Sequence, residues 1–162
     1  MRILAIDPGT TKSAYCEVDA DTYQIRDFDK IDNAALLCEM QTTMAEMVVV
    51  EMVACYGMPV GREVFETCVW IGRYLQAAEA AFKRTDRIFR QEEKLTLCHS
   101  NKAGDTNIMR ALIDRFAAHD LRSGKGTKDH PDWFHGFHRD IWAAYAVAVT
   151  WLDKQQEEKR HD

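Results

Sequence analysis

The chain has 162 residues, of which 46% are hydrophobic and 29% are charged, a composition typical of one folded globular domain and unlike that of a disordered protein. No stretch approaches the roughly 18 apolar residues of a membrane span, and the first residues lack signal-peptide architecture, so we expect a cytoplasmic protein without a membrane partner. The five cysteines are odd in number and show no metal-ligand spacing, which favours reduced thiols over a zinc site.

The formal net charge of -5 hides a gradient along the chain. Residues 1–82 carry 6 Lys and Arg against 13 Asp and Glu, whereas residues 83–139 carry 12 against 8. The middle third is therefore suited to contact phosphates, while the acidic first half needs metal ions to do so.

Three short strands open the chain, and they are expected at residues 2–6, 13–18 and 23–28. The sequence Asp19-Ala-Asp21 predicts the turn between the second and third strands. A helix is expected at 31–44, with Asp32 or Asn33 as its N-cap. Residues 47–50 then form a continuous apolar run, the pattern of a strand buried on both faces.

The second half is predicted to be mostly helical. Apolar residues at helical spacing predict a long helix at 62–83. The later elements are expected as a short strand at 87–89, helices at 91–98 and 106–118, a loop at 119–137 and a last helix at 139–154. Residues 155–162 are expected to be a frayed tail after a single domain at 1–154. This order predicts an α/β fold, a ribonuclease H-like mixed five-stranded sheet with helices on both faces.

The pentapeptide Asp7-Pro-Gly-Thr-Thr directly follows the first predicted strand. A carboxylate held rigidly at a sheet edge by a tight turn suits metal-ion catalysis on phosphodiesters. It also resembles the phosphate-binding first loop of the actin and sugar-kinase type ATPases. That alternative requires a second lobe and a second Gly-rich loop, which we do not find in 162 residues.

Two further carboxylates occupy positions that packing does not readily explain. Glu51 ends the central apolar run, and Asp140 opens the last helix beside its apolar face. If the strands that carry Asp7 and Glu51 are neighbours and the helix crosses them, the three acids meet at one edge. Converging carboxylates repel one another unless a cation intervenes, so Mg²⁺ or Mn²⁺ is indicated. Singly, each acid has an ordinary alternative as turn former, solvated strand end or helix N-cap.

Three segments, residues 3–14, 48–52 and 140–150, resemble the catalytic segments of the RuvC family of Holliday-junction resolvases. The likeness covers roughly residues 1 to 152, and residues 56–67 are closer to the RuvC-like endonucleases of bacteriophages. The resemblance implies a homodimer that nicks four-way DNA junctions in the bacterial cytoplasm or a phage-infected cell. Gly72, on the long helix, marks a place where a second helix can approach closely.

The same resemblance implies that Asp7, Glu51 and Asp140 are catalytic and ligate Mg²⁺, with Mn²⁺ as a substitute and two ions present when DNA is bound. The cellular family has a further acid where this chain has Ala143. We therefore expect one metal position to fill fully only with substrate. His138, next to the matched segment, is a candidate substitute ligand.

Basic and aromatic residues are the candidates for DNA binding. Lys94 matches a family position near the scissile phosphate, and Lys102 lies in the following turn; lysine suits a phosphate as a mobile point charge. Tyr56 lies on the loop where the cellular family places an aromatic that stacks on junction bases. Further candidates for the phosphate track are Arg90, Arg110, Lys125 and Lys128, and rivals for the stacking role are Trp133, Phe134 and Phe137.

The sequence thus predicts a Mg²⁺-dependent, structure-selective DNA endonuclease that resolves Holliday junctions and other branched DNA. Two alternatives stay open. One is a small phosphotransferase of the actin and sugar-kinase type, and the other is a non-catalytic protein that binds branched DNA.

Overall fold

The computed structural model describes residues 1–161 and contains a five-stranded sheet of order β3-β2-β1-β4-β5. Its strands are β1 (Arg2–Asp7), β2 (Lys12–Asp19), β3 (Ile25–Asp32), β4 (Met47–Met52) and β5 (Arg84–Phe89). The first three strands form an antiparallel meander, whereas β1, β4 and β5 run parallel to one another. The predicted mixed sheet of five strands is therefore confirmed.

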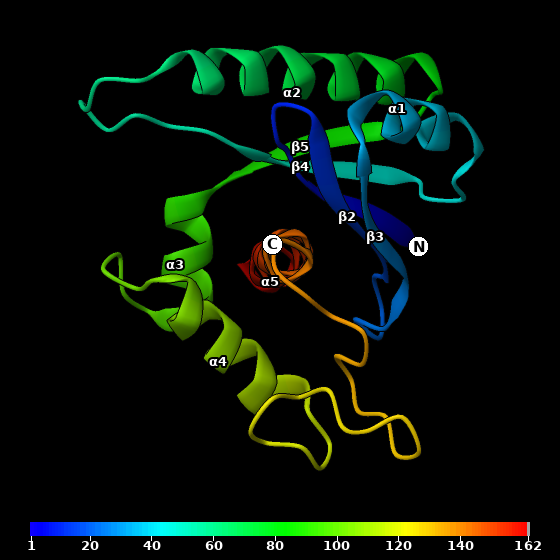
Figure 1. Cartoon of the computed structure of the whole chain (residues 1–162), viewed down its shortest axis with the longest axis vertical. Coiled ribbons are helices and arrows are strands. Elements are labelled where there is room, and N and C mark those ends of the chain that lie inside the picture. Colours follow the sequence, from blue (N-terminus) through cyan, green and yellow to red (C-terminus); the bar gives the residue numbers. More distant parts are fainter. Residues whose placement is uncertain (162) are drawn as a thin grey trace.

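Helices cover both faces of this sheet, as predicted (Figure 1). They are α1 (Asn33–Thr42), α2 (Arg62–Ala80), α3 (Arg90–Cys98), α4 (Asp105–Phe116) and α5 (Ile141–His161). The helices α1 and α2 lie on one face, and α5 crosses the other with α3 and α4 beside it (Figure 1). Among residues 1–161, no helix combines the length and the apolar character needed to cross a membrane.

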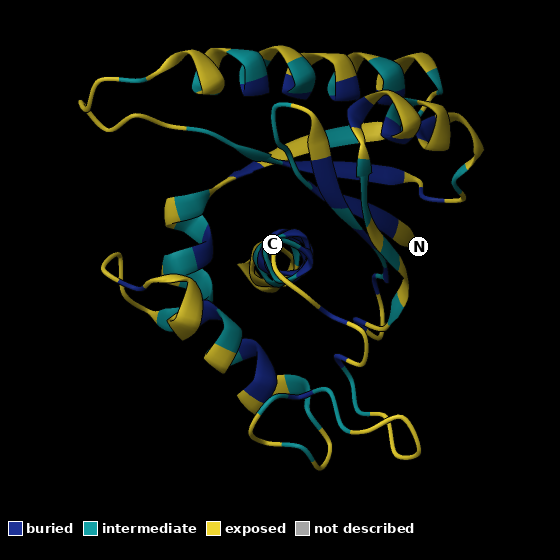
Figure 2. Cartoon of the chain, in the orientation of Figure 1, coloured by how far each residue is buried: buried dark blue, intermediate teal, exposed yellow. Residues whose placement is uncertain are grey.

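The two central strands and α5 hold the fold together. Residues 3–6 of β1 and 47–50 of β4 are buried on both faces, as their continuous apolar runs predict (Figure 2). One face packs against Leu36 and Tyr74 of α1 and α2. On the other face, every residue of α5 from 144 to 152 is buried. The start of α5 is thereby fixed against the sheet, close to the carboxyl ends of the parallel strands.

Several predicted boundaries were wrong. The third strand lies at 25–32 rather than 23–28, because the turn extends to residue 24 and β2 pairs with residues up to Asp32. The first helix therefore begins later, at Asn33, and its N-cap Asp32 makes no side-chain capping hydrogen bond. The strand β5 begins at Arg84 rather than at residue 87, since it pairs with β4 along its whole length.

The last helix differs from its predicted range of 139–154 at both ends. The last helix starts at Ile141 and continues to His161, so residues 155–161 are helical, and only Asp162 lies outside the described part. Lys154 is ion-paired with Glu92 of α3, which anchors the helix just before this extension. Basic residues in the last turn also favour the helix C-terminus.

The loop at 119–137 is ordered by two aspartates. Asp132 accepts hydrogen bonds from the backbone amides of residues 118, 119, 120 and 133, at 2.6 to 2.9 Å. Asp120 accepts hydrogen bonds from three further amides of the same loop. Together they fix the irregular backbone that carries Lys125 towards the start of α5.

Candidate active site

Asp7 and Glu51 lie side by side at the carboxyl edge of the sheet. The parallel register of β1 and β4 pairs Ile6 with Val50, so the acids that follow occupy neighbouring positions. Burial raises the pKa of Asp7 to about 8, and the charges of Glu51 and Asp140 add to this effect. Burial also raises the pKa of Glu51, whereas the nearby Arg90 lowers it. Without a cation, this pair of neighbouring carboxyl groups therefore favours a proton.

A buried polar network holds the turn after Asp7. The Gly9 amide donates to Ser13 Oγ at 3.1 Å, and the Asn33 side-chain amide donates to the Gly9 carbonyl at 2.9 Å. Ser13 also contacts Asn33 and the hydroxyl of Tyr74. A Cβ atom at Gly9 would lie 2.3 Å from the Lys12 carbonyl oxygen, so the turn requires glycine there. Because the Gly9 amide is bonded within the protein, it does not face a phosphate, which counts against the ATPase loop.

Asp140 reaches the same region but is held by another residue. It immediately precedes α5, and its carboxylate forms an ion pair with Lys30 of β3. Its charge still raises the pKa of Asp7, so the two carboxylates are near each other. Within residues 1–161, however, no three His, Cys, Asp or Glu side chains are grouped tightly enough to hold a metal ion. Of the three acids expected to lie together, Asp7 and Glu51 do so, whereas the carboxylate of Asp140 is paired with Lys30.

The structure adds a buried acid that sequence reasoning missed. Glu93, in the first turn of α3, has a side chain with 0% exposure. One of its oxygens lies 2.5 Å from Arg90 Nη1, and Arg90 also forms an ion pair with Asp105 of α4. Burial raises the pKa of Glu93 well above its ordinary value, the charges of Glu51 and Asp7 raise it further, and Arg90 opposes them. Arg90, predicted to contact DNA, is engaged by carboxylates in this structure.

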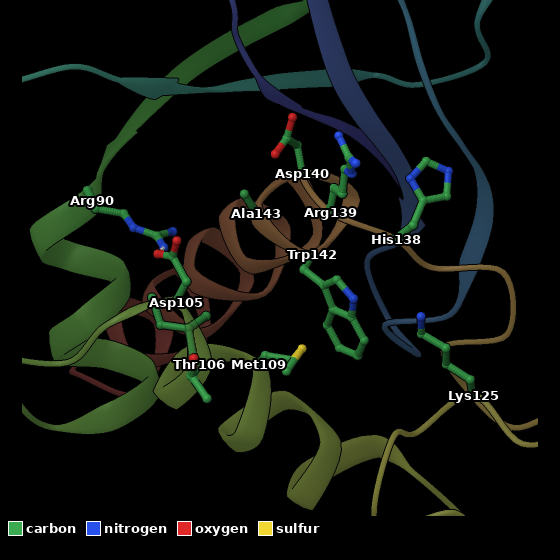
Figure 3. Close-up of a pocket in the computed structure, with 11 residues that line it drawn as sticks. Arg90, Asp105, Thr106, Met109, Lys125, His138, Arg139, Asp140, Trp142 and Ala143 are labelled. Carbon is green, nitrogen blue, oxygen red and sulfur yellow. Dashed lines mark hydrogen bonds and ion pairs between the residues drawn. The ribbon is translucent and has the colours of Figure 1, made fainter.

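A cleft of about 620 Å³ lies beside these acids, between the N-terminal ends of α4 and α5 and the 119–137 loop (Figure 3). Arg90 and Asp105 form one side, and Asp140 and Ala143 line it at the start of α5. Its other charged lining residues are Lys125, His138 and Arg139. Arg139 was not predicted, although it directly precedes Asp140.

A second hollow, of about 250 Å³, is also lined by Arg90. It is lined by Tyr56, Arg90, Gln91, Lys94 and Asn101. Tyr56 is 63% exposed and has a backbone φ of 45°, so its ring lies at the surface next to Lys94. Lys102 occupies the exposed turn that follows α3, and Lys128 is exposed in the long loop. Of the candidate basic residues, Lys94 thus shares one hollow with Arg90, and Lys125 shares the cleft with it.

Two of the three alternative stacking residues were wrong. Phe134 and Phe137 are buried, with 0% and 1% exposure, in an aromatic cluster with Trp142 and Tyr145. Trp133 is partly buried, and its indole N–H donates to the Tyr145 hydroxyl at 3.0 Å. These rings stabilise the core under the loop.

Arg110 is also occupied within the protein. It forms an ion pair with Asp114 and donates to the Leu121 carbonyl at 2.7 Å. Its guanidinium connects α4 to the following loop, so it is a poor candidate for the phosphate track.

The fold is the ribonuclease H-like fold of RuvC. The structure matches that of Thermus thermophilus RuvC with a TM-score of 0.70 and 17% identity, over 97% of both chains. It also matches T. thermophilus RuvC in complex with a Holliday junction substrate, with a TM-score of 0.66 and 18% identity, over 96% of both chains. No protein-family profile and no curated protein sequence matches this chain. At these identities the likeness establishes the fold alone.

The oxygen donors at the sheet edge fit a hard divalent cation. Asp7 and Glu51 supply carboxylate oxygens, and Glu93 Oε1 is buried without a hydrogen-bond partner in the described part of the chain. A buried carboxylate oxygen without a partner is unfavourable, and Mg²⁺ and Mn²⁺ prefer oxygen ligands. The chemistry of these donors therefore suits the metal that the sequence predicts, whereas their side chains are not yet grouped as ligands within residues 1–161.

Proposed function

We propose that this protein is a Mg²⁺-dependent endonuclease that cleaves four-way and other branched DNA. The observation that carries the proposal is the pair of half-buried acids, Asp7 and Glu51, at the carboxyl edge of a RuvC-like sheet whose neighbouring Asp140 and Arg90 line a cleft with further basic residues. Carboxylates with raised pKa values next to a cleft are typical of functional sites. The RuvC structure that binds a Holliday junction supports DNA as the substrate.

In this proposal Asp7, Glu51 and Asp140 hold Mg²⁺, or Mn²⁺ in its place. The bound ions would activate water and neutralise the charge that develops on the phosphate. Asp140 would leave Lys30 to join the other two acids. Ala143 lies in the cleft where the family resemblance expects an acid, so one metal position would depend on oxygens from the DNA. His138 lines the same cleft and is an optional ligand.

The DNA backbone would pass over the two hollows that Arg90 lines. Lys94 and Lys102 would contact phosphates on one side, and Lys125 and Lys128 on the other. Tyr56, exposed beside Lys94, would stack on a junction base and contribute about 1 to 3 kcal/mol to binding.

A homodimer would place two such sites on opposite strands of a junction. The open face of α2 supports this, because a Cβ atom added at Gly72 meets nothing within 4 Å and Phe65 and Val69 are each 62% exposed. The phage-like origin and the location in the bacterial or infected-cell cytoplasm are predictions of the same proposal.

A nicking assay tests the proposed function. We expect a labelled four-way junction to be cut in Mg²⁺ or Mn²⁺ and left intact in EDTA, with a linear duplex as the matched control. Products should carry a 5′-phosphate and a 3′-hydroxyl. Junction binding without cleavage under all metal conditions would instead favour the non-catalytic DNA-binding alternative. Nucleotide hydrolysis without DNA cleavage would favour the phosphotransferase.

Junction affinity should fall steeply with salt, because Lys and Arg displace counterions from the phosphates they contact. Replacing Lys102 by Ala should reduce the slope of log affinity against log salt by about one unit if this lysine neutralises one phosphate. Lys159→Ala, in the last turn of α5, is the matched control and should leave the slope unchanged. An unaltered slope in Lys102→Ala would show that Lys102 is an ordinary solvated lysine that contacts no phosphate.

A further inference from the structure

The buried acid on α3 has an oxygen that the protein leaves unsatisfied. Glu93 Oε2 is paired with Arg90, whereas Oε1 has no hydrogen-bond partner in residues 1–161. The side chain has 0% exposure, so bulk water does not provide the missing partner. Such an oxygen loses its hydration without compensation, which makes it costly unless another group binds there.

The position of α3 brings this oxygen to the edge where Asp7 and Glu51 lie. The strand β5 pairs in parallel with β4, with Ile88 opposite Glu51, and α3 begins directly after β5. The first turn of α3 therefore stands above the end of β4. In agreement, Glu51 exerts the largest charge effect on Glu93, and Asp7 also acts on it.

Arg90 is the cation that faces this group in the structure. It is paired with Glu93 and Asp105, and its charge also acts on Glu51 and Asp7. The buried carboxylate of Glu93 and the half-buried carboxylates of Asp7 and Glu51 thus have one guanidinium near them, which Asp105 also engages. One positive charge does not balance three negative charges, so the site favours a divalent cation in place of Arg90.

We propose that Glu93, once released from Arg90, turns to become a direct ligand of the divalent cation that Asp7 and Glu51 hold, and that it supplies in the DNA-free protein a carboxylate that Ala143 does not. The inference rests on the proposed metal site of the preceding subsection. Arg90 is then a resident counter-ion of the metal-free state, and it competes with the metal for the same carboxylates.

Calorimetric titration of the DNA-free protein with Mn²⁺ tests the inference. Glu93→Gln keeps the shape of the side chain but removes its charge, and it should weaken Mn²⁺ binding about tenfold or more. Glu92→Gln is the matched control, because this neighbouring acid is paired with Lys154 and not with the acids at the sheet edge; its affinity should equal that of the wild type. Circular dichroism and thermal melting establish that each variant is folded.

The variant Arg90→Gln distinguishes two roles of Glu93, as a direct metal ligand or as a residue that only positions Arg90. Removing the competing cation should strengthen Mn²⁺ binding, by about threefold or more if the lost repulsion amounts to about 0.7 kcal/mol. In this background, adding Glu93→Gln should still cost about tenfold. If the double variant binds Mn²⁺ as tightly as Arg90→Gln alone, Glu93 acts through Arg90 and the inference is wrong.

Failure of this inference can be told apart from failure of the proposed function. Mn²⁺ binding that is lost in Asp7→Asn but unchanged in Glu93→Gln would overturn the role of Glu93 and leave the proposed site intact. Binding unchanged in both Asp7→Asn and Glu51→Gln would overturn the site itself. No Mn²⁺ binding to the DNA-free wild type would also overturn the inference, while metal-dependent junction cleavage would still uphold the nuclease.

Discussion

Asp7→Asn, Glu51→Gln and Asp140→Asn are each expected to reduce junction cleavage to about a thousandth of the wild-type rate or less, while junction binding persists. Each substitution removes one charge from the proposed metal site. Because the three proposed ligands act together on the metal, the loss of any one of them removes most of their joint contribution to the rate. Binding persists because the basic residues around Arg90 and the long loop are unaltered. Single-turnover cleavage and a gel-shift assay with the same junction measure the two effects.

The matched control for these variants is Asp21→Asn. Asp21 lies in the β2 to β3 turn, its side chain is 83% exposed, and its carboxylate is ion-paired with the N-terminal amine. Its cleavage rate should equal that of the wild type. If any of the three acid variants nicks the junction at the wild-type rate, that residue has no place in the proposed site. This test is most demanding for Asp140, because in the structure its carboxylate is paired with Lys30 and not with the other two acids.

Sequence reasoning located Asp7 and Glu51 well because each ends an apolar run. A continuous β-branched or aliphatic segment predicts a buried parallel strand, and the acid that follows then has to lie at the sheet edge. The register of β1 and β4 confirms that these two acids are neighbours. The order of strands and helices along the chain predicted the mixed five-stranded sheet with helices on both faces, whereas the order of the strands within the sheet came from the structure.

The site residues that sequence analysis missed owe their roles to contacts with residues far away in the sequence. Lys30 is an ordinary charged residue of a strand until the fold brings it to Asp140, 110 residues away. Glu93 occurs in a helix segment rich in charged residues, where a surface position is the usual expectation. Only the arrangement of α3 over β4 shows that it is buried beside Glu51.

In the loop at 119–137, aromatic residues that were expected to be exposed are buried. Its Gly, Lys, His and aromatic residues predicted an exposed binding loop, and composition alone does not distinguish a ring that faces DNA from one that faces the core. The backbone bonds to Asp120 and Asp132 fold the loop back on α5. As a result Phe134 and Phe137 complete the hydrophobic core.

Phe134→Ala is accordingly expected to lower the free energy of unfolding by about 3 to 5 kcal/mol, the usual cost of removing a buried aromatic ring. Phe134 has 0% exposure and packs on Trp142 with ring centroids 4.5 Å apart. Gly124, at a φ of 70°, lies against the same ring, and its missing side chain leaves the space that the ring fills. A variant without the ring therefore leaves a cavity under the loop. Urea denaturation followed by circular dichroism measures the loss.

Tyr56→Ala is the matched control for this prediction, because Tyr56 is 63% exposed. Its removal should change the free energy of unfolding by only about 0.5 kcal/mol, while junction binding weakens by the stacking contribution. The two aromatic variants thus have opposite expected profiles: one loses stability, and the other loses affinity. If Phe134→Ala is as stable as the wild type and binds junctions less tightly, Phe134 contacts DNA and the loop has to open to expose it.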